Sequence, residues 1–352
     1  MKPTKPTKPS VSVIVPAYNE GEILRENLTQ LCDYMKSIEK TYGWELIVVN
    51  DGSTDGTGEI AEAFARTRDN VRVLHHVANF RLGQALRSAF KETKGDYVIA
   101  MDSDMSYSPD HIEKMLQTMI ETGSQIVIAS PYMSGGKISN VPWFRKVLSI
   151  WANRFLSITA RGKINTITGM VRAFDRRFLR ALDLKAKDVD INHEIIFKAQ
   201  LLGARIVEIP AHLDWGFQKS TSKNRRSSTR LLRHFFSCLG SGFMFRPIMF
   251  FIVPGLVLML LASYTLLWVF IHTVNHYEKV SSSLVGFDAR FSAAVGAAFQ
   301  QSPHSFFVGS ISLVLAIQLI SLGILALQNK RYFEDLFHIS TTLHRYQQES
   351  DD

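Results

Sequence analysis

Two long uncharged apolar segments constrain this chain more than any other feature of its sequence. Residues 248–274 and 306–328 are almost wholly apolar, although charged residues make up 20% of the 352 residues. About 20 helical residues, each rising roughly 1.5 Å, cross the hydrocarbon core of a bilayer. A buried helix of a soluble protein is the alternative for each segment. We expect two transmembrane helices within residues 248–330, with both ends of the chain on one side of the membrane.

The basic residues predict which side that is. They are dense between residues 219 and 246 and again after residue 329, whereas the loop of about residues 275–305 carries only Lys279 and Arg290. Lys and Arg favour the cytoplasmic side of a membrane. The pattern predicts a multi-pass protein of the cell membrane, or of the ER membrane in a eukaryote. The loop then lies outside or in a lumen, and the residues before 248 and the tail 331–352 lie in the cytoplasm.

The net charge of +8 indicates a partner that carries phosphate groups. A nucleic acid, an anionic membrane surface and a phosphorylated substrate all fit that charge. No helix-turn-helix and no aromatic-basic strand pattern is present, so we expect no nucleic acid. The two cysteines, Cys32 and Cys238, provide neither a disulfide framework nor zinc-site spacing.

Residues 11 to about 130 alternate short apolar runs with helical patterns that have one apolar face. The expected strands are residues 11–15, 44–49, 71–74, 97–101 and 126–129, and the expected helices are residues 23–38, 57–66, 83–93 and 110–121. This alternation predicts an α/β fold with a mainly parallel sheet, helices on both faces, and ligands at the carboxyl ends of the strands. The Lys-Pro-Thr repeats of residues 1–10 predict a flexible tail.

The stretch from about residue 140 to residue 247 is less regular and is rich in basic side chains. Residues 143–159 and 231–247 are amphipathic, and a late strand is expected over residues 205–210. Helices that lie in the membrane interface have the Trp and Arg content of residues 143–159, although a core helix is the alternative there. We expect both amphipathic stretches to hold the domain at the membrane surface.

Polar residues follow three of the expected strands. PAYNE (16–20) follows the first strand, NDGSTDG (50–56) the second and DSD (102–104) the fourth. Each alone fits a turn or a helix cap. Because parallel strands bring their carboxyl ends to one edge, their joint placement favours a single site. Carboxylates repel a diphosphate but can hold a Mg²⁺ or Mn²⁺ ion that binds it.

These motifs, VIVPAYNE, VVNDGSTDGT and DSD, resemble those of glycosyltransferase family 2 in order and spacing. The resemblance covers residues 11 to about 230 and implies the GT-A fold, a Rossmann-like domain with a mainly parallel sheet. With two C-terminal transmembrane helices, the chain is similar to the polyprenyl-phosphate glycosyltransferases, which include dolichol-phosphate mannose synthases and undecaprenyl-phosphate sugar transferases. The expected order is a tail (1–10), a GT-A domain (11–230), a juxtamembrane amphipathic helix (231–247), two transmembrane helices (248–330) and a cytoplasmic tail (331–352).

The resemblance implies roles on the donor side of the site. The residues that match the nucleotide-contacting segment are Pro16, Ala17, Tyr18 and Glu20, and Asp51 matches the acid that holds the base. Asp102 and the catalytic Asp104 match the pair that contacts the donor diphosphate through Mg²⁺ or Mn²⁺, and Ser106 or water takes the place of a further metal ligand. Asn79 and Gly83 match the Asn and Gly ahead of the next helix.

Other matches lie on the acceptor side. Arg145 and Arg172 match basic positions near the acceptor phosphate, and Glu194 matches an acidic position that follows the sheet. Three further residues fall in a basic loop that closes over the phosphates: Lys219, Arg226 and Arg230.

Three positions depart from the family pattern. The family continues its aspartate motif as D-x-D-L-Q, whereas this chain has Met105 and Ser106 after Asp104. Its Ser-Arg-Tyr after the fifth strand is Ser-Pro-Tyr (130–132), and its Asn-x-Gly ahead of a helix is Asn-Phe-Arg (79–81). These changes bear on the sugar and base preference rather than on the reaction class.

The resemblance implies transfer of a sugar from a nucleotide-sugar, of the GDP-mannose or UDP-glucose type, to a polyprenyl or dolichyl monophosphate with inversion. A phosphate with a second pKa near 6 is largely ionised at neutral pH, so the enzyme's task is positioning and electrostatics. Two alternatives stay open: a processive polysaccharide synthase, whose Gln-x-x-Arg-Trp signature is absent, and a non-catalytic membrane-anchored nucleotide-sugar binding protein. A homo-oligomer also stays open.

Overall fold

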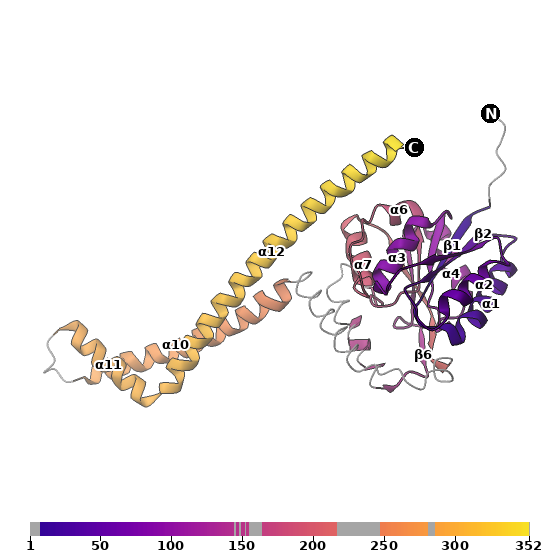
Figure 1. Ribbon diagram of the computed structural model, residues 1–352. Helices are drawn as coiled ribbons and strands as arrows, with labels where there is room; N and C mark the ends of the chain where they lie inside the picture. The colour runs from indigo at the N-terminus through magenta and orange to yellow at the C-terminus, as the bar shows by residue number, and fades with distance from the viewer. Residues whose placement is uncertain are drawn as a thin grey trace. The chain divides into compact units, whose positions relative to one another are not determined.

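The computed structural model describes residues 8–143, 146, 147, 149–151, 153, 154, 164–216, 247–280 and 286–351. The chain forms two compact units, one of Met1–Ser241 with Leu336–Asp352 and the other of Gly242–Asp335. The first unit holds a sheet covered by helices and the second consists of helices (Figure 1).

The sheet of the first unit has seven strands in the order β3-β2-β1-β4-β7-β5-β8. These strands are β1 (Ser10–Ala17), β2 (Gly43–Asn50), β3 (Val71–His75), β4 (Tyr97–Ala100), β5 (Ile126–Ser130), β7 (Arg172–Asp175) and β8 (Ile206–Pro210). Only β7 runs antiparallel to its neighbours, β4 and β5. The mainly parallel sheet predicted from the sequence is therefore confirmed. A small second sheet pairs β6 (Lys137–Ser139) with β9 (His212–Asp214).

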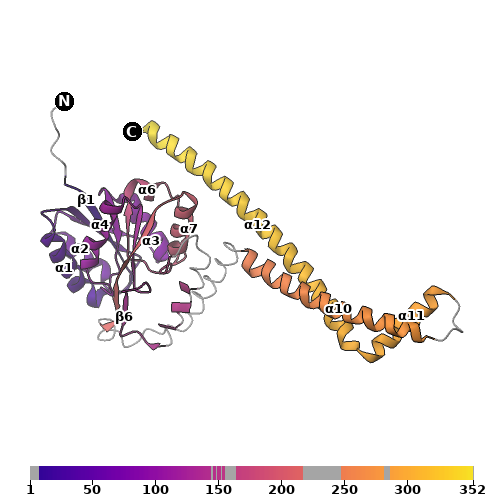
Figure 2. The same cartoon turned by 180° about the vertical axis from the view of Figure 1, so that it is seen from behind.

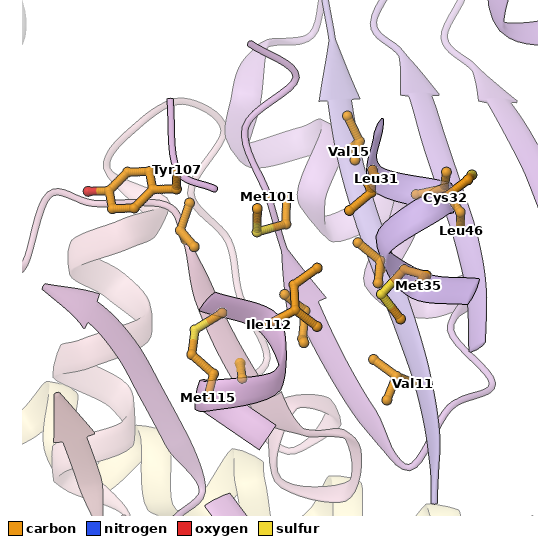
Figure 3. Packing of buried hydrophobic residues seen from close by; sticks show 14 of the residues in the cluster. Val11, Val15, Leu31, Cys32, Met35, Leu46, Met101, Tyr107, Ile112 and Met115 are labelled. Carbon is orange, nitrogen blue, oxygen red and sulfur yellow. The ribbon is translucent and has the colours of Figure 1, made fainter. Parts of the chain in front are cut away.

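Helices cover both faces of the sheet (Figures 1 and 2). One face carries α1 (Gly21–Ser37), α2 (Thr57–Ala65) and α4 (Asp110–Thr122), and the other carries α3 (Arg81–Glu92), α6 (Arg176–Arg180) and α7 (Ile191–Leu201). Strand β1 contributes Val13 to the first core and Ile14 to the second, because successive side chains of a strand point to opposite faces. Figure 3 shows Leu31 and Met35 of α1 against β1 in the first core.

The predicted elements up to residue 130 agree with the observed ones to within about two residues at each end. Strand β1 continues to Ala17, which places Pro16 and Ala17 inside it. Strand β8 matches the predicted late strand. Strand β7, with the sequence RAFD, was not predicted, because four residues that begin and end with charged side chains show neither an apolar run nor alternation.

The second unit contains the two apolar segments as helices. A π-helical turn, η1 (Ile248–Ile252), continues into α10 (Val253–Lys279), and α12 covers Pro303–Asp351. The candidate spans Ile248–Lys279 and Pro303–Phe337 have mean hydropathies of 2.2 and 2.3, with only 11% and 17% of their apolar windows buried. This exposure argues against the core helix of a soluble protein, so these are two apolar helices that could span a membrane.

The segment between the spans differs from the predicted external loop. Residues 287–301 form a helix, α11 (Phe287–Gln301), because its Ala-rich sequence has high helix propensity. The predicted cytoplasmic tail is also helical, since α12 continues to Asp351.

Small residues let α10 and α12 pack closely and antiparallel. A Cβ on Gly255 would lie 2.8 Å from Ile320 Cγ1, and a Cβ on Gly309 would lie 2.8 Å from Thr265 Oγ1. Helices in membranes commonly associate through such close approach of small residues.

Truncation of a side chain in the first core should destabilise the protein more than truncation of an exposed side chain. We expect Leu31→Ala to lower the free energy of unfolding by about 3 kcal/mol, because Leu31 is 1% exposed and its truncation leaves a cavity. Ile120→Ala on α4, where the side chain is 48% exposed, should cost less than about 1 kcal/mol. Urea unfolding of the detergent-solubilised protein, followed by circular dichroism, measures both. Equal losses would contradict the assignment of Leu31 to the core.

Candidate functional site

The three polar segments meet at one edge of the sheet. Strands β2, β1 and β4 are adjacent and parallel, with Ala17 paired to Asn50 and Ile14 paired to Ala100. The three segments that follow these strands therefore leave the sheet side by side at its carboxyl edge, as the sequence predicts. They are residues 18–20, 51–56 and 102–104.

The first two segments are joined by hydrogen bonds between side chains and backbone. Asn19 N donates to Ser53 Oγ at 3.1 Å, and Thr54 N donates back to Asn19 Oδ1 at 2.9 Å. Glu20 N donates to Thr57 Oγ1 at 2.9 Å. The predicted nucleotide segment is thus held in one conformation, with Tyr18 beside it as a 37% exposed ring.

Asp55 fixes the starts of two helices. Its Oδ2 accepts from Gly21 N, the first residue of α1, at 3.0 Å, and its Oδ1 accepts from Thr57 N, the first residue of α2, at 3.1 Å. Burial acts to raise the pKa of Asp55, but the bonds from Thr57 and Gly21 outweigh it and lower that pKa. The sequence gives no clear signal for this role, because Gly56 and not Asp55 occupies the N-cap position of α2.

Asp51, expected to hold the base, is buried among groups of its own chain. Its Oδ1 accepts from Phe80 N at 3.0 Å and lies 2.7 Å from His76 Nδ1, and its Oδ2 accepts from Arg81 N at 2.7 Å. His76 Nε2 in turn lies 2.9 Å from Ser88 Oγ of α3. Asp51 therefore orders the segment before α3.

Arg81 stands where the family carries a glycine, and it retains a glycine-like backbone. Its φ is 73°, in the left-handed region, and its N–H also reaches Asn79 Oδ1 at 3.1 Å. Its guanidinium pairs with Asp188 at 2.6 Å. Asn19 (φ 54°) and Met105 (φ 52°) share this conformation. Non-glycine residues in this region cluster at functional sites, and here Asn19 and Met105 lie in loops beside the carboxyl edge while Arg81 begins α3.

Asp102 and Asp104 follow β4 and form an electrostatically unfavourable pair. Burial, and after it the neighbouring Asp104 carboxylate, raise the pKa of Asp102 to about 7, although the Ser106 hydroxyl opposes both. Ser106 Oγ lies 3.4 Å from Asp102 Oδ2, and Ser106 N donates to Asp104 Oδ1 at 3.0 Å. From α1, Asn27 Nδ2 donates to Ser103 O at 2.8 Å and holds the motif, a contact that the sequence analysis missed.

This pair fits a divalent cation. Two adjacent carboxylates that repel each other are relieved by a positive ion, and hard oxygen ligands suit Mg²⁺ or Mn²⁺. Among the described residues, no group of three or more His, Cys, Asp or Glu side chains could hold a metal. The protein would thus supply two carboxylates, with Ser106 adjacent, and leave other coordination positions to a ligand or water.

Arg172, which the resemblance implies to lie near the acceptor phosphate, makes its contacts within the protein. Its side chain is completely buried, Nη1 donates to Asn192 O at 2.8 Å, and Nη2 donates to Ile167 O at 2.6 Å. Burial lowers the pKa of Arg172 to about 9, and Glu208 opposes that shift. The guanidinium is thus enclosed and serves two carbonyls, and its expected role near the acceptor phosphate stays a prediction.

Glu194 is likewise bound by groups of its own chain. Its carboxylate accepts from Lys185 N at 2.9 Å and Ala186 N at 2.8 Å, and it pairs with the buried Lys198 at 2.7 Å. These contacts hold the turn before α7, and a catalytic role for Glu194 stays a prediction. At Gly83, in contrast, the neighbouring backbone leaves no room for a side chain, because a Cβ there would lie 2.5 Å from Lys187 C.

Several predicted positions lie outside the described residues. They are Arg145, Lys219, Arg226, Arg230 and nearly all of the juxtamembrane stretch 231–247. Of residues 143–159, those that are described are helical up to Arg154, and they expose Trp143, Val147 and Trp151 at four-residue spacing.

The Glycosyl transferase family 2 model matches residues 12–183 of the chain. A polyprenol monophosphomannose synthase from Mycolicibacterium smegmatis is 31% identical over 64% of this chain and 85% of its own length. An undecaprenyl-phosphate mannosyltransferase from Micrococcus luteus is 33% identical over 57% and 82%. A dolichol-phosphate mannosyltransferase from Pyrococcus furiosus is 32% identical over 57% of this chain, which covers only 55% of that protein.

A solved structure shares the fold. Glucosyl-3-phosphoglycerate synthase from Mycobacterium tuberculosis, in complex with Mn²⁺, uridine diphosphate and phosphoglyceric acid, has a TM-score of 0.50 and 21% identity. The match covers 66% of this chain and 78% of that one.

The raised pKa of Asp102 predicts a pH-dependent stability. Between the ordinary value of 3.8 and about 7, the unfolded chain loses this proton while the folded chain keeps it. The stability contributed by this group therefore falls by about 1 kcal/mol per pH unit over that window and levels off above about pH 7. Asp102→Asn removes this term, so the variant should gain stability relative to the wild type as the pH rises from 5 to 7. Denaturant unfolding of the metal-free protein tests this, and parallel curves for the two proteins would contradict it.

Proposed function

The chain belongs to glycosyltransferase family 2 and has the GT-A fold, and we propose that this glycosyltransferase moves a sugar from a nucleotide-sugar to a polyprenyl monophosphate. The donor is of the GDP-mannose or UDP-glucose type, the acceptor is a dolichyl or undecaprenyl phosphate, and the anomeric centre is inverted. The named activities of the three relatives support the lipid phosphate as acceptor.

The observation that carries the proposal is the carboxylate pair at the end of β4, beside the ordered ends of β1 and β2. In a sheet of this type the nucleotide binds across such loops, here with Pro16, Ala17, Tyr18, Glu20 and Asp51. The pair would then lie at the diphosphate.

A Mg²⁺ or Mn²⁺ ion, held by Asp102 and Asp104 with Ser106 adjacent, would neutralise the charge of the leaving nucleoside diphosphate. The solved structure with the same fold holds Mn²⁺ and a nucleoside diphosphate, which supports such an ion here. The protein's own contribution is geometric, because Asn27 and Ser106 hold the two carboxylates in place before any ligand arrives.

The acceptor phosphate is itself the nucleophile in this proposal. Its ionised oxygen attacks the anomeric carbon, the bond to the diphosphate breaks, and no strong general base is needed. Two anions must approach each other, so cationic side chains are required near them. The cationic residues that we propose near the two anions are Arg145, Lys219, Arg226 and Arg230.

The membrane would present the acceptor to this edge. The two apolar helices would span it in a multi-pass arrangement, with the catalytic domain in the cytoplasm, in the cell membrane or the ER membrane. The exposed Trp143 (75%) and Trp151 (69%) would rest in the headgroup layer, since Trp favours that interface.

A direct assay tests the proposal. We expect the detergent-solubilised protein, with Mn²⁺ or Mg²⁺ and a panel of UDP- and GDP-sugars, to transfer one sugar to polyprenyl phosphate. Asp104→Ala should lower the rate by roughly 100-fold or more, because the diphosphate loses its electrostatic partner. Asp110→Ala is the control, since Asp110 is partly exposed and pairs with Lys114 on α4, and its rate should stay within about twofold. Donor hydrolysis alone, or a long polymer without glycolipid, would contradict the proposal.

A further inference from the structure

The sheet order distinguishes a donor side from an acceptor side of the site. The nucleotide segments follow β2 and β1 and the carboxylate pair follows β4, so the next strands, β7 and β5, border the other side of the metal pair. Because β7 is antiparallel, it begins at the carboxyl edge, where Arg172 lies opposite Ala100 and Ile128. The segment that leads into β7, residues 164–170, therefore opens on the same edge as Asp102.

This segment also lies beside Tyr107, a residue close in the chain to the carboxylate pair. A Cβ on Gly169 would lie 4.0 Å from Tyr107 Oη, and Tyr107 follows Asp104 by three residues. We name residues 164–170 the acceptor-side segment.

The backbone of the acceptor-side segment is held by hydrogen bonds to buried side chains and not by the main-chain hydrogen bonds of a strand or helix. Asn153, which is 1% exposed, accepts through Oδ1 from Ile167 N at 2.9 Å and from Thr168 N at 3.1 Å. Asn153 Nδ2 lies 2.9 Å from Thr168 Oγ1 and also donates to Ser149 O at 3.0 Å.

Three further side chains complete this frame. Glu208 accepts from Asn165 N at 2.9 Å and Thr166 N at 2.7 Å. The carbonyls are held by Arg172 and Asn192, since Arg172 Nη2 donates to Ile167 O and Asn192 Nδ2 donates to Thr168 O at 3.1 Å. Four consecutive amides, 165–168, are thus satisfied by side chains. Burying so many polar groups is costly unless all are paired, so the frame defines one conformation of the segment.

We infer that the acceptor-side segment forms the wall against which the lipid phosphate is positioned, and that Asn153 is the positioning residue that sets this wall, supported from within by Arg172. The inference rests on the proposed function. Asn153 lies on the same helical stretch as the exposed Trp143 and Trp151. It therefore ties the wall to the surface that would contact the bilayer, where the acceptor phosphate arrives.

The test compares three variants of the full-length protein in the transfer assay. Asn153→Ala removes both amide functions, whereas Asn153→Asp keeps an acceptor for Ile167 N and Thr168 N. Thr93→Val is the matched control, because Thr93 is also 1% exposed with one buried hydrogen bond, to Phe90 O, and it precedes β4 at the opposite edge.

We expect Asn153→Ala to raise the KM for polyprenyl phosphate at least about tenfold, with the donor KM and the Mn²⁺ requirement within about twofold of wild type. Asn153→Asp should restore the acceptor KM to within about threefold, and Thr93→Val should change neither KM. An unchanged acceptor KM in Asn153→Ala, equal rises in both KM values, or no rescue by Asp would overturn the inference while leaving the proposed function intact. If the wild type transfers no sugar to polyprenyl phosphate, the proposed function and the inference both fail.

Discussion

The repulsion between Asp102 and Asp104 is the constraint on which the rest of the site depends. Burial disfavours the charge of Asp102 most strongly and the neighbouring Asp104 carboxylate adds to this, so together they raise the pKa of Asp102 to about 7. A fold tolerates such a cost where a bound cation offsets it. The neighbouring contacts from Asn27 and Ser106 hold the pair in place and do not remove its charge. The site is thereby organised before it meets a ligand.

Many polar residues around this pair act on the backbone. Asp51 orders the segment before α3, Asp55 joins the starts of α1 and α2, and Asn153 and Glu208 hold the segment before β7. Loops at a sheet edge lack a hydrogen-bond ladder, so side chains must supply partners for their amides. Residue type alone therefore does not separate a ligand contact from a backbone contact, and Glu194 shows this most clearly.

The sheet order also gives the site a direction. The loops that we propose for the donor follow β2 and β1, the carboxylates follow β4, and the antiparallel β7 brings a further loop to the same edge. The same chain carries apolar helices that could span a membrane, so the site that we propose for a soluble donor and a lipid acceptor would have a physical means of meeting both. The family and the relatives named for lipid-phosphate substrates agree with that arrangement.

The sequence by itself determined the α/β class, the elements up to residue 130, the shared edge of the three motifs and the two apolar helices. These follow from local periodicity and from the rule that parallel strands end at one edge. Only the tertiary structure decided that Arg172 and Glu194 face inward, that β7 inserts antiparallel between β4 and β5, and that Arg81 keeps a left-handed backbone. Each of these depends on partners distant in the chain, such as Asn192 for Arg172 and Asp51 for Arg81, and local sequence carries no record of such contacts.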